Sequence, residues 1–243
     1  MIDLRSPEPV RVTVRPPDPA GFTLAALAEV AATLPPERVE HHRAVDLPDL
    51  LPDGKVTRDP RPVAEVIADL DRGDSWVMLT GLASREPYRS AALQVGAPLQ
   101  LAARVAGETP TTVDLIVFLG AARTRVPFHC DVGHHVLLQL EGTKTLAVGW
   151  YDDPEVEQAM RAVSVGRNRA NPDRLPDRIE EIVLEPGDAV ALPAFCFHAV
   201  TDCSGRSRAL TAVLRTDVTE ATAAVLEARR AADPGGSPPA SVG

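Results

Sequence analysis

Two short stretches that lie far apart in this sequence constrain its fold more than any other feature. The first is VPFHCDVGHH, which carries His129 and Asp131, and the second is PGDAVALPAFCFH, which ends at His198. His129 and Asp131 are two residues apart, so on a β-strand their side chains point to the same side. Two imidazoles and one carboxylate form the facial ligand set of non-haem Fe(II) sites. If the three residues share a site, the fold must bring a later strand alongside the first.

A His-x-Asp pair alone is weak evidence for a metal, because His129 and Asp131 could form only a hydrogen-bonded pair. The second stretch favours the metal interpretation, since it predicts a turn followed by a strand that delivers His198 after a bend at Pro193. If residues 129–139 form one strand without a bulge, six residues share one face: His129, Asp131, Gly133, His135, Leu137 and Gln139.

The pattern of apolar residues predicts a mainly β protein with helical flanks. Helices are expected at 21–34, 62–73, 152–163 and 218–233. Strands are expected at 76–82, 113–120, 129–139, 145–151, 179–188, 189–200 and 207–216. Residues 35–62 are expected to be mostly loop with His41 and His42 exposed, and 84–106 fit no single pattern. Strands and helices do not alternate in the second half, which indicates an antiparallel barrel or jelly roll.

Composition narrows the class of partner. The chain has 243 residues and a formal net charge of −9, which disfavours a surface for nucleic acid or anionic membranes. The sequence contains no run of about 18 apolar residues, so no membrane-spanning helix is expected. The N-terminus has no apolar region typical of a secretory signal. Three cysteines give no disulfide framework. We therefore expect a cytoplasmic protein.

The combined motifs resemble the jumonji-type and cupin-like Fe(II)/2-oxoglutarate oxygenases. The resemblance rests on HCD, LLQLEGTK and PGDAVALPAFCFHAV, and it covers roughly residues 75–216. It implies a mainly β fold with a double-stranded β-helix (jelly roll) core at 75–216. Residues 1–74 would then form an N-terminal flank with helices, and residues 217–243 one C-terminal helix and a flexible tail.

The resemblance also implies a role for each candidate residue. His129, Asp131 and His198 would bind Fe(II), with 2-oxoglutarate at two of the three remaining positions and O₂ at the third. In such enzymes a basic residue about fifteen positions after the first His binds the far carboxylate of 2-oxoglutarate, and here that residue is Lys144. Strand alternation, and not the resemblance, places His135 and Gln139 on the same face, where they either contact substrate or a metal ligand or are ordinary hydrogen-bonded residues.

A second contact for 2-oxoglutarate stays open. Relatives often have Thr three residues before the first His, whereas this chain has Val126. Thr211 and Arg208 on the last strand are the candidates, and their spacing allows only one of them to face inward.

The sequence leaves the substrate and the outcome of the reaction open. The substrate would be a small molecule or an amino-acid residue in a peptide or protein, and either hydroxylation or desaturation fits. Asp131 argues against halogenation, because a halide would need the place of the carboxylate. The alternatives are a cupin-type metalloenzyme without 2-oxoglutarate, in which Lys144 only forms a salt bridge, and a non-catalytic metal- or ligand-binding module.

The last predicted helix carries an apolar stripe at helical spacing. Its members are Val218, Ala221, Val225, Ala228 and Ala232. This stripe either packs on the barrel or forms a homodimer contact.

Overall fold

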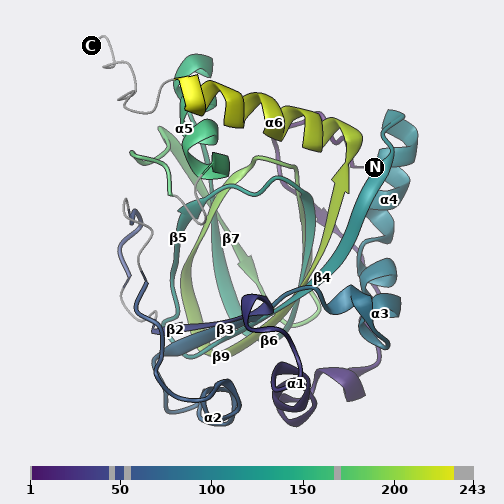
Figure 1. Cartoon of the computed structure of the whole chain (residues 1–243), viewed down its shortest axis with the longest axis vertical. Helices are drawn as coiled ribbons and strands as arrows, with labels where there is room; N and C mark the ends of the chain where they lie inside the picture. Colours follow the sequence, from purple (N-terminus) through teal and green to yellow (C-terminus); the bar gives the residue numbers. More distant parts are fainter. Residues whose placement is uncertain (1, 44–46, 52–55, 167–170, 233–243) are drawn as a thin grey trace.

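The chain forms an antiparallel β barrel with helices packed around it (Figure 1). The computed structural model describes residues 2–43, 47–51, 56–166 and 171–232. The strands in these residues are β1 (Val10–Val12), β2 (Val39–Arg43), β3 (Ser75–Leu79), β4 (Pro110–Gly120), β5 (Val126–His129), β6 (His134–Trp150), β7 (Arg178–Leu184), β8 (Ala189–Leu192) and β9 (Phe197–Thr216). The α-helices are α1 (Leu24–Ala31), α2 (Val63–Ala68), α3 (Tyr88–Val95), α4 (Ala97–Ala106), α5 (Pro154–Gly166) and α6 (Asp217–Ala232).

Strands β6 and β9 run antiparallel along most of their length and connect two sheets. The first half of β6 pairs with β8 and with the second half of β9, and the second half of β6 pairs with β7 and with the first half of β9. Strands β1, β4, β3 and β2 extend the first sheet, and β5 extends the second. Apolar side chains from both sheets, among them Leu137, Leu146 and Val200, pack in the space between them. This arrangement is a double-stranded β-helix, as predicted.

Gly142 marks the point at which β6 passes from one sheet to the other. The register against β9 shifts between Gln139 and Thr143. Gly142 has a φ of +68°, and a Cβ atom there would lie 2.2 Å from the carbonyl oxygen of Arg206. Only glycine accommodates both conditions. The shift reverses the alternation of side chains, so His135 and Leu137 before it and Lys144 after it line the same interior cavity.

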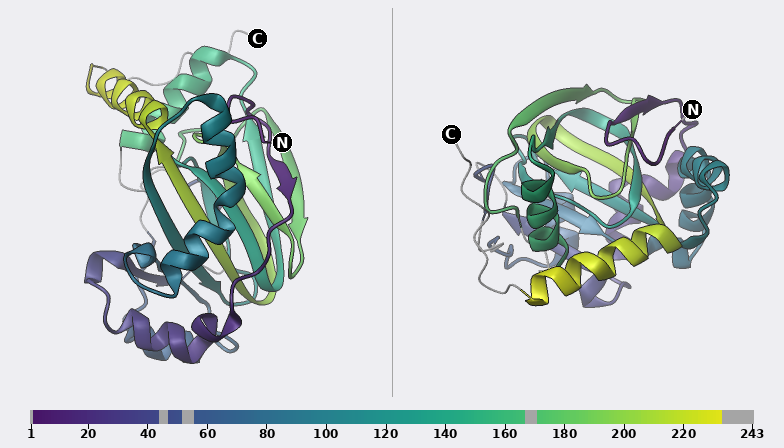
Figure 2. Two further views of the ribbon diagram at one scale, coloured as in Figure 1. Left: turned by 90° about the vertical axis from the view of Figure 1, so that its right-hand side faces the viewer. Right: turned by 90° about the horizontal axis from the view of Figure 1, so that it is seen from above.

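Helices cover the outer face of the first sheet and part of the outer face of the second, where β7 stays exposed (Figure 2). Leu27 of α1 and Leu99 of α4 belong to the same buried cluster as Val136 and Leu210 of the first sheet. On the second sheet, Met160 and Val156 of α5 pack in a cluster with Phe128, Ala147 and Phe197. The interior between the sheets is therefore flanked by a layer of apolar packing on each side.

The main correction to the sequence prediction concerns residues 35–62. This stretch contains β2, which pairs with β3 from Val39 to Arg43. His41 is only 5% exposed, and the His42 ring packs on Trp76 with centroids 4.9 Å apart, so the expectation of two exposed loop histidines is wrong. Proline and charged residues on both sides of VEHHR concealed its alternating burial. Residues 84–106 contain α3 and α4.

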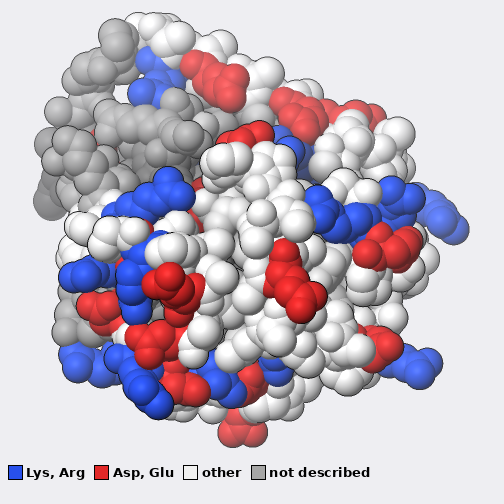
Figure 3. Space-filling model, turned by 60° about the horizontal axis from the view of Figure 1, so that its bottom comes forward, with Lys and Arg blue, Asp and Glu red and all other residues white. Residues whose placement is uncertain are grey.

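The surface carries charges of both signs. On the face shown in Figure 3, acidic and basic side chains are interspersed, and neither sign forms an extended patch. Among the described helices, none combines the length and the apolar character that crossing a membrane requires.

Replacing Gly142 tests the crossover between the sheets. Gly205 has a similar φ of +73°, but a Cβ atom added there would have nothing within 4 Å, so Gly205→Ala is a matched control. We expect Gly205→Ala to lower the free energy of unfolding by about 1–2 kcal/mol through backbone strain. Gly142→Ala should cost about 1–3 kcal/mol more because of the overlap with Arg206. Urea unfolding measures both, and equal losses would contradict the close packing at Gly142.

Candidate metal centre

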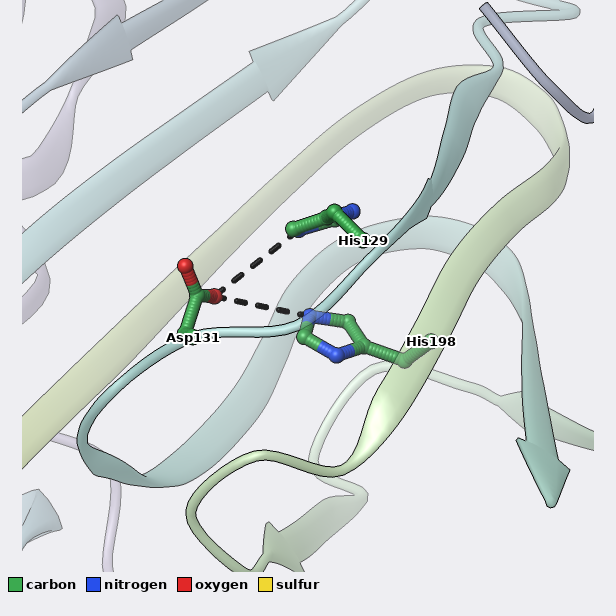
Figure 4. Close-up of side chains that lie close together, drawn as sticks. All are labelled: His129, Asp131 and His198. Atoms are coloured by element: carbon green, nitrogen blue, oxygen red, sulfur yellow. Dashed lines mark ion pairs between the residues drawn. The ribbon is translucent and has the colours of Figure 1, made fainter. Parts of the chain in front are cut away.

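His129, Asp131 and His198 lie together where β5 meets β9 (Figure 4). His129 is the last residue of β5 and stands directly opposite His198 in the antiparallel pairing with β9. Asp131 lies in the corner that connects β5 to β6. One possible donor atom from each residue lies within 4.8 Å of the other two. Strand pairing thus brings together residues that are distant in the sequence.

The backbone fixes one ring nitrogen of each ligand imidazole. Nδ1 of His129 is 2.9 Å from the carbonyl oxygen of Pro127, and Nδ1 of His198 is 2.9 Å from that of Cys196. Because a carbonyl oxygen can only accept, each Nδ1 carries the proton and each Nε2 keeps a free lone pair. The two Nε2 atoms lie 3.8 Å and 3.7 Å from Oδ2 of Asp131. Both rings are therefore oriented to bind a metal through Nε2.

Electrostatics keep His198 and Asp131 in the protonation states that bind a metal. Burial lowers the pKa of His198 to about 3, and His129 acts in the same direction, so the His198 imidazole is neutral at pH 7. Burial raises the pKa of Asp131, but the fields of His135, His129 and His198 outweigh it and bring that pKa to about 2. A cation can bind to His198 and Asp131 without first displacing a proton from either.

A cavity of about 440 Å³ contains the three residues and also reaches Lys144. The Asp131 side chain is 46% exposed and lines this cavity. Lys144 is 1% exposed, and its Nζ lies 4.4 Å from the centroid of the Phe118 ring. Burial lowers the pKa of Lys144, while the nearby Cys203 raises it. In the described part of the chain, no carboxylate lies within 4.0 Å of Nζ.

Of the two candidates for a second co-substrate contact, Thr211 lies at the cavity and Arg208 does not. Thr211 pairs with Leu137 across β9 and β6, and both residues line the cavity. Arg208 forms a 3.1 Å ion pair with Glu141 and donates a hydrogen bond to the carbonyl oxygen of Phe22. Arg208 therefore ties the first sheet to the N-terminal segment.

His135 and Gln139 occupy different surroundings. His135 lines the cavity, and its Nδ1 is 3.7 Å from Oδ2 of Asp131. Gln139 is fully buried, and its Nε2 donates to two carbonyl groups at residues 141–142 and to Oγ of Ser207. Gln139 thus stabilises the crossover of β6 rather than lining the cavity.

Part of the cavity wall was not predicted from the sequence. Glu40 of β2 and Met78 of β3 stand in one cross-strand row with Phe118 of β4, and all three line the cavity. Asn171, whose Nδ2 donates to the Phe128 carbonyl oxygen, lines it from the segment that follows α5. The alternation in VEHHR was the one signal that could have revealed Glu40.

Comparisons with known proteins agree with this architecture. A family model described as a JmjC domain matches residues 100–221. An X-ray structure of E. coli YcfD superposes with a TM-score of 0.56 at 15% identity, over 88% of this chain and 50% of that one. A crystal structure of Escherichia coli ribosomal oxygenase YcfD gives 0.50 at 17% identity, over 87% and 49%. A complex of YcfD with cobalt and 2-oxoglutarate gives 0.49 at 18% identity, over 96% and 57%.

A sequence comparison with curated proteins gives no match. The chain spans about half the length of the YcfD structures. The likeness to them is one of fold, and it agrees with the double-stranded β-helix described above.

The buried histidines predict that the metal-free protein loses stability between pH 7 and pH 5. Unfolded histidine titrates near pH 6.5, whereas burial lowers the pKa of His198, His135 and His134 in the folded state. The unfolded state therefore binds more protons than the folded state in this range, and the free energy of unfolding decreases as the pH is lowered from 7 to 5. The slope is about 1.4 kcal/mol per pH unit for each proton taken up. Urea unfolding at a series of pH values measures it. His198→Gln should make the slope shallower, and an unchanged slope would contradict the assignment.

Proposed function

This chain belongs to the JmjC domain family, and on that premise we propose that it is an Fe(II)- and 2-oxoglutarate-dependent oxygenase. The reaction proposed is hydroxylation of a small molecule or of an amino-acid residue in a peptide or protein. In it, O₂ and 2-oxoglutarate are consumed, one oxygen atom enters a substrate C–H bond, and the other enters succinate as CO₂ leaves.

The observation that carries this proposal is the buried ammonium group of Lys144. It shares a cavity with three donors suited to Fe(II), yet no carboxylate in the described residues lies within 4.0 Å of it. A buried ion without a counter-ion costs several kcal/mol, and the contact with the Phe118 ring offsets only part of this cost. An anionic ligand that enters the cavity would offset this cost through a charge-assisted hydrogen bond. 2-Oxoglutarate has one carboxylate for this contact and a 2-oxo acid group for the metal.

Each residue has a distinct part in this proposal. His129 and His198 bind the metal through Nε2, and Asp131 supplies a carboxylate oxygen. The bound metal supplies the site at which O₂ is activated when 2-oxoglutarate is decarboxylated. Lys144 and Thr211 hold the far carboxylate of 2-oxoglutarate. The apolar wall of the cavity keeps water from the reacting groups.

The environment of Lys144 also bears on the alternatives. In a cupin-type metalloenzyme without 2-oxoglutarate, Lys144 is expected to form an ordinary salt bridge, and the described residues provide none. A non-catalytic binding module would have no need of three donors that leave part of the coordination sphere open. Both observations favour the oxygenase.

The size of the cavity limits the substrate. A volume of about 440 Å³ is at the lower end of ligand sites and has to hold the co-substrate as well. A small molecule, or one side chain of a peptide or protein, fits this space. The ribosomal oxygenase YcfD is about twice as long as this chain, so we leave both substrate classes in the proposal.

Succinate production tests the proposed reaction. Anaerobically iron-loaded protein should convert 2-oxoglutarate to succinate on exposure to O₂, and His129→Ala should abolish this. Lys144→Met should raise the 2-oxoglutarate concentration for half-maximal rate by about 10–100-fold, because a hydrogen bond to a charged group contributes about 1.5–3 kcal/mol. Thr211→Val should raise it less than tenfold. Arg208→Met is the control and should leave it unchanged.

If turnover without substrate is too slow to detect, measurements of binding and stability test whether the protein uses 2-oxoglutarate. Lys144→Met should weaken 2-oxoglutarate binding to the metal-loaded protein while stabilising the ligand-free protein, because it removes a buried charge. If metal-loaded wild-type protein neither binds 2-oxoglutarate nor forms succinate, the metalloenzyme without 2-oxoglutarate replaces this proposal.

Helix α6 presents its apolar stripe to solvent, so the expectation that this stripe packs on the barrel is wrong. The buried residues of α6 are Thr219, Ala223 and Leu226, whereas Val218 and Val225 are 49% and 67% exposed. The remaining proposal is that the stripe contacts a second copy of the chain. Alternating steps of three and four residues suit the pairing of two helices.

Sedimentation of the purified protein tests this homodimer. We expect a dimer that Val225→Glu converts to monomer with little change in thermal stability, because the side chain is exposed. Glu227→Ala, on the same helix but outside the stripe, should leave the dimer intact. A monomeric wild-type protein at micromolar concentration would exclude the contact.

A further inference from the structure

Three imidazoles, rather than two, surround the carboxylate of Asp131. Oδ2 of Asp131 lies 3.8 Å from Nε2 of His129 and 3.7 Å from Nε2 of His198. The third is Nδ1 of His135, also at 3.7 Å from the same oxygen. His135 is 6% exposed and comes from the first half of β6, so it approaches from a different strand than the two ligands.

His135 stands outside the ligand group. The donor atoms of His129, Asp131 and His198 all lie within 4.8 Å of one another, and no atom of His135 joins that set. Its ring meets the ring of His198 edge to face, with centroids 6.1 Å apart. His135 thus lies next to the Asp131 carboxylate and the His198 ring without joining the group of three donors.

The Asp131 carboxylate needs a partner of this kind. Among the described residues, no donor lies within hydrogen-bonding distance of either of its oxygens, and no Lys or Arg nitrogen lies within 4.0 Å. Metal-binding carboxylates are as a rule oriented by an outer hydrogen-bond donor. Nδ1 of His135 is about 0.5 Å beyond hydrogen-bonding distance. A hydrogen bond between them therefore requires a rotation of the His135 or the Asp131 side chain.

Strand pairing holds His135 in place. Its backbone lies between Leu192 of β8 and Val213 of β9. At Gly133, in the corner that carries Asp131, a Cβ atom would lie 2.7 Å from Cγ1 of Val213. The corner is thus packed directly against the strand next to His135, which fixes the approach of the carboxylate to the ring.

We propose that His135 is a positioning residue that donates its Nδ1–H to the Asp131 carboxylate, so that Asp131 binds the metal through one oxygen. A carboxylate held in this way leaves the coordination positions that a chelating co-substrate and O₂ require. The use of those positions rests on the function proposed above, whereas the effect of His135 on metal binding does not.

Amide substitutions of different length test the proposal at atomic level. In His135→Asn the amide nitrogen lies near the place of Nδ1, whereas in His135→Gln it lies near the place of Nε2 and away from Asp131. His135→Leu removes the donor. His134→Gln is the matched control, since His134 is equally buried but faces Glu108 on the other side of β6.

Co(II) serves as the probe, because it binds such sites without turnover and its visible absorption reports coordination. We expect His135→Leu and His135→Gln to bind Co(II) about 10–100-fold more weakly than wild type. His135→Asn should stay within about threefold of wild type, and so should His134→Gln. Circular dichroism establishes which variants fold. If His135→Leu does not fold, the comparison of His135→Asn with His135→Gln is sufficient to test the proposal.

Two results would overturn the proposal. Wild-type affinity in His135→Leu or His135→Gln would mean that His135 does not position Asp131. Equal weakening in the Asn and Gln variants, with a Co(II) spectrum that reports one ligand fewer, would make His135 a metal ligand. The titrations contain no 2-oxoglutarate, so their outcome is independent of whether the protein turns that compound over.

Discussion

The continuous antiparallel pairing of β6 with β9 is the interaction on which the rest of the structure depends. One half of this pair belongs to each sheet, so it sets the spacing of the sheets and the shape of the interior. The same pairing places His135 and Thr211 in the first sheet, and Lys144 and His198 in the second. Because β5 pairs with β9 at His129 and His198, the backbone pairing of these strands fixes the relative positions of the two histidines.

This geometry carries an energetic cost that the apolar layers outside the barrel offset. The interior holds the imidazoles of His135 and His198 and the ammonium of Lys144 in positions where burial lowers each pKa. A fold selected for stability alone would fill these positions with apolar residues. Their presence next to an open metal-donor set is the pattern of a site that trades stability for binding.

The sequence predicted the parts of the site that depend on local spacing. The two-residue spacing of His129 and Asp131 predicted that their side chains lie together, whereas Lys144 was singled out only by the family resemblance, in which a basic residue follows the first His by about fifteen positions. Gln139 was expected on the cavity face because strand alternation was extended through residue 139, yet the register shift that begins there ends the alternation. Neither the bulge nor Gly142 as its cause can be recognised without the partner strand. Packing between segments that are distant in the sequence also limited what could be predicted. The predicted stripe on α6 runs through Val218 and Val225, but the helix instead turns Thr219, Ala223 and Leu226 towards the protein, where α5 and β9 lie. Likewise β2 is a strand only because β3 provides hydrogen-bond partners for it.

The residues that line the cavity come from two parts of the chain. The residues assigned to the metal and the co-substrate all lie within 100–221, the region that the family model matches. Part of the cavity wall, including Glu40, Trp76 and Met78, comes from strands before that region. These strands join the barrel through the pairing of β3 with β4, and they form no ladder with β5, β6 or β9. Side chains on β2 and β3 therefore shape part of the cavity, although these strands do not pair directly with the strands that hold the metal donors.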